Sequence, residues 1–204
     1  PTLSSHPATA AGAGGPWRAL DLPSCADAAS GAGVAEDDAA VRAVLSGLPG
    51  DETAILLGHS RGGTVITEAG THDRVGHLVY LTALLLEKGE NPGTRIGLTL
   101  ANATVKNPDG TWTADVAAGA DLFYNDCDGS EISWAASKLR SQTVAVDTRN
   151  SVEAWKTTPT TYVVCNLDKA LTPETQRSMA EHAQHVVEWE TGHSPFLNRP
   201  ELVA

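Results

Sequence analysis

The stretch A-I-L-L-G-H-S-R-G-G, residues 54–63, decides the fold. An apolar run typical of a buried strand leads into G-H-S-R-G, and the residues that follow can continue as a helix. A serine in such a bend projects its hydroxyl clear of both elements, and the flanking glycines let the backbone pass where a Cβ would clash. The pattern predicts that Ser60 is a nucleophile; the alternative is a glycine-rich turn with an incidental serine.

The helix that begins after this bend supplies part of the expected chemistry. Its N-terminus would face the serine, which favours a negative charge that develops there. The backbone N–H of Arg61 is therefore predicted to be one oxyanion donor. We expect the Arg61 side chain on the surface, with attraction of an acidic substrate as the alternative, and His59 packed beneath the bend.

Composition excludes several classes of protein. The chain has 204 residues, 41% of them hydrophobic, which is enough for one domain with a substantial core. The formal net charge of −11 and the lack of a basic stripe argue against nucleic acid as a partner. No apolar run approaches the roughly 20 residues that span a bilayer, and the N-terminus does not read as a signal peptide. We therefore expect a cytoplasmic protein that does not bind a membrane.

The cysteines do not form a disulfide framework by pattern. The chain has an odd number of cysteines, which are far apart in the sequence: Cys25, Cys127 and Cys165. Cys165 lies in an apolar run, which predicts that it packs in the core. A bridge between Cys25 and Cys127 stays open. Paired Cys/His spacing and H-x-x-x-H are both missing, so no metal site is expected.

Strand-like and helix-like segments alternate along most of the chain, which predicts an α/β fold with a mostly parallel sheet and helices on both faces. Residues 17–23 are typical of a short strand that ends in a turn. Thr172 is expected to cap a helix that has Pro173 at its first position. Helices are predicted over 36–48, 63–69 and 173–183, and strands over 54–57, 77–83, 161–165 and 185–189.

Residues 86–152 break this alternation. Asn107-Pro108-Asp109-Gly110 is a strong turn signal that predicts a hairpin, and residues 114–124 and 131–139 are typical of helices. We interpret the segment as a small cap over the active site rather than an ordinary long crossover. The aromatic residues Phe123 and Trp134 could line a substrate pocket or pack the cap onto the body. The expected organisation is coil over 1–16, core over 17–85 and 153–204, and cap over 86–152.

A nucleophilic serine needs a base and an orienting carboxylate. His193 follows the last predicted strand and Asp168 follows the strand before it, and the carboxyl ends of parallel strands are where an open sheet places its ligands. These positions predict His193 as the base and Asp168 as its orienter. The alternatives are a solvated loop histidine and an aspartate that only caps a turn.

The chain resembles the α/β-hydrolase superfamily, in particular bacterial esterase-like proteins related to plant methyl esterases and hydroxynitrile lyases. The matching segments are L-D-L-P-S at 20–24, G-H-S-R-G-G at 58–63, residues 162–173, and G-H-S-P-F at 192–196. The resemblance implies an α/β-hydrolase fold, a Ser60–His193–Asp168 triad and no cofactor. Hydroxynitrile lyases carry a lysine where this chain has Ser194, which weakens a lyase interpretation.

The beginning of the chain departs from that family. The family carries an apolar strand and a His-Gly loop, which supplies the second oxyanion donor, and residues 1–16 hold only the weak substitute G-A-G-G at 12–15. We therefore expect an N-terminally shortened fold. A missing strand would leave a sheet edge open to another chain, which predicts a homodimer.

The leading expectation is a serine carboxylesterase for small to medium apolar or aryl esters. One alternative is a catalytically weak or inactive ligand-binding homologue that lacks a complete oxyanion hole. Another is a lyase or a carbon–carbon hydrolase that uses the same triad.

Overall fold

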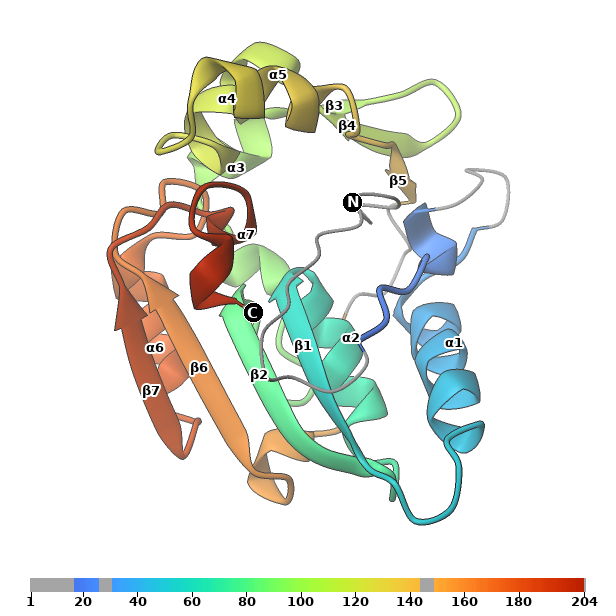
Figure 1. The fold of residues 1–204 in the computed structure, drawn as a ribbon. Coiled ribbons are helices and arrows are strands. Elements are labelled where there is room, and N and C mark those ends of the chain that lie inside the picture. Colours follow the sequence, from blue (N-terminus) through green and yellow to red (C-terminus); the bar gives the residue numbers. More distant parts are fainter. Residues whose placement is uncertain (1–16, 26–30, 144–148, 204) are drawn as a thin grey trace.

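Four parallel strands form the centre of the molecule. The structure, a computed structural model, describes residues 17–25, 31–143 and 149–203, so the coil expected over 1–16 lies outside the described residues. The strands are β1 (Ala54–Ser60), β2 (Val75–Ala83), β6 (Thr160–Cys165) and β7 (His185–Trp189), in the spatial order β1-β2-β6-β7 (Figure 1). The predicted parallel sheet is confirmed.

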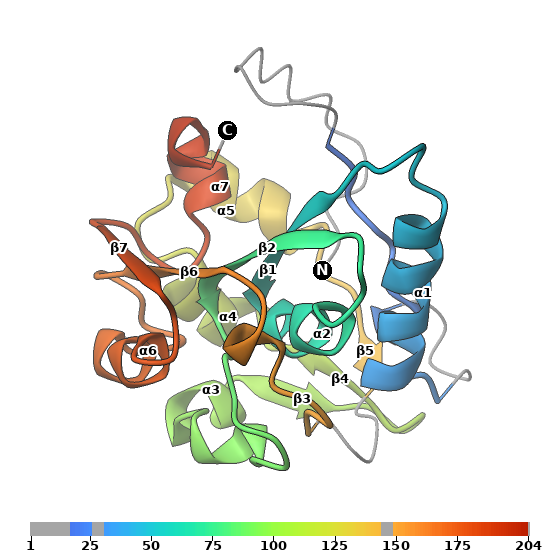
Figure 2. The same ribbon diagram turned by 90° about the horizontal axis from the view of Figure 1, so that it is seen from below.

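Helices pack on both faces of this sheet, as predicted. Seen along the strands, α2 (Gly62–Ala69) and α6 (Pro173–Ala180) cover one face, with α1 (Val34–Ser46) beside α2, and α7 (Pro195–Asn198) lies on the other (Figure 2). The Thr172 side chain accepts from Thr175 N–H at 3.4 Å and caps α6, as expected. Helix α6 ends three residues earlier than the predicted bound at Ala183.

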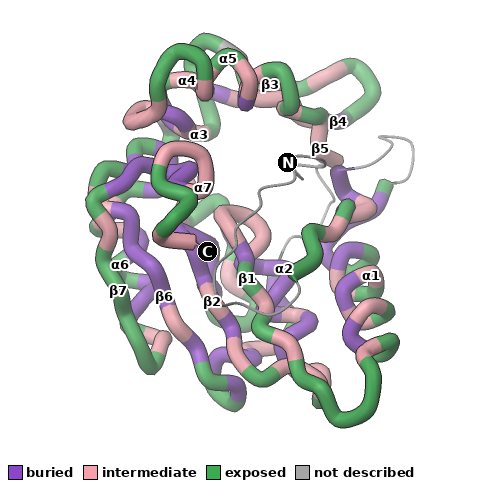
Figure 3. Tube along the Cα trace, in the orientation of Figure 1, coloured by how far each residue is buried: buried purple, intermediate pink, exposed green. Residues whose placement is uncertain are grey.

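The core lies between β2, β6 and the helices of one face. Tyr80 and Tyr162 are fully buried and stack in parallel, with ring centroids 6.3 Å apart. Buried residues follow β2 and β6, whereas β7 is exposed along most of its length (Figure 3). Cys165 is buried as predicted, in a separate apolar cluster with Leu81 and Val163. All three cysteines are free, so the Cys25–Cys127 bridge is ruled out.

Strand β1 is not the fully buried strand that its apolar sequence predicts. The side chains of Ile55 and Leu57 are 70% and 48% exposed, because no described element covers that face of β1. Leu56 points the other way and packs against the core. Within the described residues, β1 pairs only with β2, so its outer edge is open. The homodimer expected from such an edge stays a prediction.

The strand expected over residues 17–23 is absent, and this prediction is wrong. The segment has no regular structure before a 3-10 helix, η1 (Pro23–Cys25). Its end is tied to α1 instead of a strand, because Ser24 donates from its N–H and its Oγ to the two oxygens of Asp37, at 2.9 and 2.7 Å. Because Ser24 holds this segment against α1, residues 17–23 do not lie beside a strand with which they could pair.

Between β2 and β6 the chain forms an insert at the carboxyl ends of the strands (Figure 1). It contains a small antiparallel sheet of β3 (Thr104–Lys106), β4 (Thr111–Ala114) and β5 (Gln142–Thr143). The predicted turn connects β3 to β4, with Gly110 at a φ of 86°. Its remaining elements are η3 (Pro92–Thr94), α3 (Leu98–Asn102), α4 (Val116–Phe123) and α5 (Gly129–Ala136), and after the insert η4 (Ala154–Lys156) leads into β6.

The helices of the described ranges are all too short or too polar to pass through a bilayer.

Candidate active site

Ser60 stands at the bend between β1 and α2. Its φ of 55° is in the left-handed region, which a residue other than glycine occupies at a cost of about 1–3 kcal/mol. The bend is tight: a Cβ on Gly58 would lie 2.7 Å from the carbonyl oxygen of Gly62 in the first turn of α2. The strained turn therefore requires glycine at position 58 and holds the serine between the strand and the helix.

Asp168 lies in the turn after β6 and is almost fully buried, at 4% exposure. Its Oδ1 accepts hydrogen bonds from the N–H groups of Ala170 and Leu171, at 2.7 and 2.9 Å. Burial alone would raise the pKa of Asp168, but the adjacent His193 and the hydrogen bonds to the carboxylate hold that pKa below its ordinary value. The carboxylate is therefore ionised at neutral pH.

His193, in the loop after β7, is 2% exposed and places Nδ1 at 2.7 Å from Asp168 Oδ2. An ionised carboxylate only accepts, so the neutral imidazole donates from Nδ1 and carries its free lone pair on Nε2. The structure thus brings together the predicted orienter and the predicted base. Within the described residues, Ser60 Oγ has no hydrogen bond to His193.

His59, directly before the serine, connects the bend to the His193 loop. Its Nε2 lies 2.7 Å from the carbonyl oxygen of His193, and the two ring centroids are 4.7 Å apart. Burial, reinforced by the neighbouring His193, lowers the pKa of His59 to about 3. The ring is therefore neutral and donates to the carbonyl, so that the residue beside Ser60 contacts the loop that carries His193.

The Arg61 side chain does not lie on the surface, and that expectation is wrong. Its Nη1 donates to Asp37 Oδ2 at 3.0 Å and to Ser24 Oγ at 3.1 Å, and the Asp37 side chain is fully buried. A buried carboxylate needs such a partner, since an unpaired buried charge is costly. The backbone N–H of Arg61 remains at the start of α2, where N–H groups lack an acceptor within the helix.

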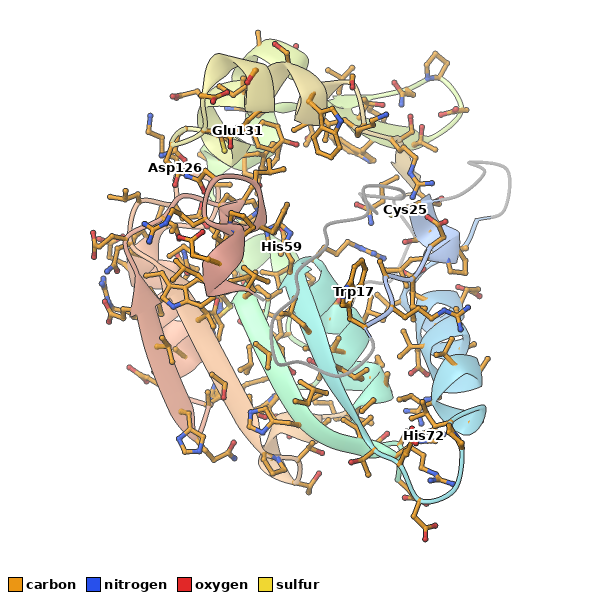
Figure 4. The ribbon with its side chains drawn as sticks, in the orientation of Figure 1. Trp17, Cys25, His59, His72, Asp126 and Glu131 are labelled. Carbon is orange, nitrogen blue, oxygen red and sulfur yellow. The ribbon has the colours of Figure 1, made fainter. Side chains whose placement is uncertain are left out.

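Residues of the insert hold both loops of the site, which the sequence motifs did not reveal. Asn125 Nδ2 donates to the carbonyl of Leu167 at 3.0 Å, next to Asp168, and Asp126 Oδ2 accepts from Gly192 N–H at 2.5 Å, next to His193. Asp126 and His59 lie at the same end of the sheet (Figure 4). The connection between α4 and α5 therefore bridges the loops that carry Asp168 and His193.

Two further buried side chains contact the Asp168 carboxylate. Thr82 at the end of β2 donates from Oγ1 to Oδ2 at 2.5 Å, and Gln176 of α6 donates from Nε2 to the same oxygen at 3.2 Å. No motif singles out either residue. A polar residue at the end of an apolar strand is the one signal that could have pointed to Thr82.

The predicted pocket residues differ in how the structure places them. The Phe123 ring, at the end of α4, has its centroid 5.5 Å from that of His193. Trp134 lies half-buried on α5, and its place in the pocket stays a prediction.

Part of this sequence is shared with known proteins. Among curated proteins, the chain is 28% identical over 202 positions to Alpha/beta hydrolase nvfD of Aspergillus novofumigatus, covering 91% of this chain and 81% of that protein. It is 26% identical over 186 positions to Probable hydrolase R7 of a Phoma species, covering 82% and 74%.

Solved structures show the same fold. A pyrethroid hydrolase from Sphingobium faniae superposes with a TM-score of 0.77 at 24% identity, over 91% of this chain and 81% of that one. The methylesterase MES16 from Arabidopsis superposes with a TM-score of 0.74 at 21% identity, over 91% and 82%. The family model described as "Alpha/beta hydrolase family" matches residues 3–204. The chain therefore belongs to the α/β-hydrolase family.

Proposed function

We propose that this protein is a serine carboxylesterase that acts through an acyl-enzyme on Ser60. The observation that carries the proposal is the hydrogen bond between His193 Nδ1 and Asp168 Oδ2, in loops at the end of the sheet where Ser60 stands in its strained bend. Hydrolases and an esterase among the structurally similar proteins support this class of reaction.

The steps follow from the protonation states of the site. Ser60 Oγ attacks the ester carbonyl while His193 Nε2 takes the hydroxyl proton, and Asp168 stabilises the resulting imidazolium. The oxyanion accepts from the Arg61 N–H at the start of α2. Collapse expels the alcohol, which takes the proton from Nε2, and water then hydrolyses the acyl-enzyme by the same sequence. These steps need no cofactor.

The expected substrates are small to medium apolar or aryl esters. Phe123 against the His193 ring places an apolar surface beside the proposed base. In this proposal the insert over 86–152 acts as a cap, and it is anchored to both catalytic loops through Asn125 and Asp126. A fixed apolar wall favours acyl or aryl groups that pack against it.

The test is hydrolysis of p-nitrophenyl esters from acetate to decanoate by the unmodified chain, Ser60→Ala and the control Ser46→Ala. Ser46 is exposed, and among the described residues its side chain makes a hydrogen bond only with His72. Activity that Ser60→Ala abolishes and Ser46→Ala retains supports the proposal. Absence of both turnover and labelling by a fluorophosphonate at Ser60 contradicts it and favours a ligand-binding homologue. Labelling without ester turnover favours a lyase or carbon–carbon hydrolase.

A further inference from the structure

Thr82 has an unusual backbone at the end of β2. Its φ is 37°, and the residue is β-branched and fully buried. A β-branched residue in the left-handed region is a true outlier, because Cβ and its substituents crowd the backbone. Conformations of this kind persist only when the surroundings hold them, and they gather at functional sites.

A β-bulge between β1 and β2 produces this conformation. His59 pairs with Leu81, but the next residue, Ser60, pairs with Ala83, so that Thr82 is the extra residue on β2. Bulges of this kind redirect a side chain out of the regular alternation of a strand. The bulge thus lies at Ser60 on β1 and at Thr82 on the neighbouring strand β2.

The redirected side chain reaches the acid of the site. Thr82 Oγ1 donates to Asp168 Oδ2 at 2.5 Å, and this is the same oxygen that accepts from His193 Nδ1 at 2.7 Å. The two donors come from segments that are far apart in the sequence, because Thr82 ends β2 and His193 follows β7. Gln176 Nε2 also reaches this oxygen, at 3.2 Å, but the two short bonds are those of Thr82 and His193. A second short bond to the same oxygen fixes the orientation of the carboxylate, and hence the direction in which the imidazole must lie.

Gln176 cannot supply the same restraint. Its Nε2 donates to the carbonyl of Leu171 at 2.6 Å and reaches Asp168 Oδ2 only at 3.2 Å, while its Oε1 accepts from Cys165 N–H at 2.8 Å. Its short bonds therefore join α6 to the end of β6 and to the turn that precedes the helix. The hydroxyl of Thr82 makes its only described hydrogen bond with the carboxylate.

We propose that Thr82 is a positioning residue, which the bulge in β2 aims at Asp168 so that the carboxylate holds His193 in its working orientation. For its kinetic consequence this inference rests on the proposed esterase function. The left-handed φ of Thr82 implies that the native state gives up stability to place this hydroxyl. Thr82→Gly relieves that strain, so it should lower activity without a matching loss of stability.

Three variants test this. Thr82→Val removes the hydroxyl at nearly constant shape, Thr82→Gly removes both the hydroxyl and the backbone strain, and Thr82→Ser restores the hydroxyl. We expect kcat to fall about 10- to 100-fold in the first two variants with little change in KM, since a hydrogen bond to a charged group is lost. Thr82→Ser should stay within a few-fold of the unmodified chain.

A second readout does not depend on turnover. The His193 Nδ1 proton that faces Asp168 should give a far-downfield proton resonance, identified by its loss in His193→Gln. This resonance should move or broaden in Thr82→Val and Thr82→Gly and return in Thr82→Ser. Even if the chain hydrolyses no ester, these spectra still test the positioning role, so that failure of the proposed function is distinguishable.

The proposal is overturned if Thr82→Gly or Thr82→Val keeps both the kcat and the resonance of the unmodified chain. It is also overturned if loss of kcat in these variants only follows loss of folded protein in urea titrations. Retained or increased stability of Thr82→Gly together with reduced kcat supports it.

Discussion

Replacement of Gly58 by alanine should damage both the stability and the site. The new Cβ would lie 2.7 Å from the carbonyl oxygen and 2.8 Å from the carbonyl carbon of Gly62. An ordinary carbon–oxygen contact is about 3.4 Å, so the first turn of α2 must move by roughly 0.7 Å, and overpacking of this size costs about 1–3 kcal/mol. Because Ser60 lies between the two contacting residues, we expect kcat to fall by up to about 100-fold.

The matched control is Gly62→Ala, since a Cβ on Gly62 meets nothing within 4 Å and alanine favours a helix by about 0.5–1 kcal/mol. Urea unfolding followed by tryptophan fluorescence measures both variants, because Trp155 is buried in the core. We expect the midpoint to fall for Gly58→Ala and to stay or rise for Gly62→Ala. Equal midpoints for Gly58→Ala and the unmodified chain would refute the close-approach argument.

Three further predictions follow from burial and charge. The folded pKa of His59, about 3, lies below the unfolded value of about 6.5, so the unfolded chain binds the extra proton and stability is lost as pH falls. Urea titrations should show that the free energy of unfolding falls by about 1–2 kcal/mol from pH 6.5 to 5. His59→Gln should remove this part of the pH dependence, and an unchanged pH dependence in this variant contradicts the prediction. Arg61→Met leaves the buried Asp37 with only neutral donors and should cost about 3 kcal/mol in the same assay, whereas a loss below about 1 kcal/mol would show that the pair is not needed. Sedimentation should show a dimer that pairs along the open edge of β1 and that a lysine on this edge strand, Ile55→Lys or Leu57→Lys, weakens. A monomeric mass for the unmodified chain argues against the homodimer.

Local signals carried the fold prediction well because they act over a few residues. The turn at Asn107–Gly110 and the helix cap at Thr172 depend on short-range chemistry, and both appear in the structure. Strand β7 was predicted with its observed bounds. The segment 17–23 failed because a strand needs a partner, and the pairing of Ser24 with Asp37 ties that segment to a helix instead.

The sequence by itself determined the serine bend, the order of strands and helices, and the residues that follow the carboxyl ends of β6 and β7. Those features follow from glycine geometry and from the periodicity of apolar residues, which each short segment carries alone. Only the tertiary structure decided that His59 contacts a loop 134 residues away and that a bulge aims Thr82 at Asp168. Contacts of this kind depend on side-chain direction and strand register, which are set only when distant segments pack together.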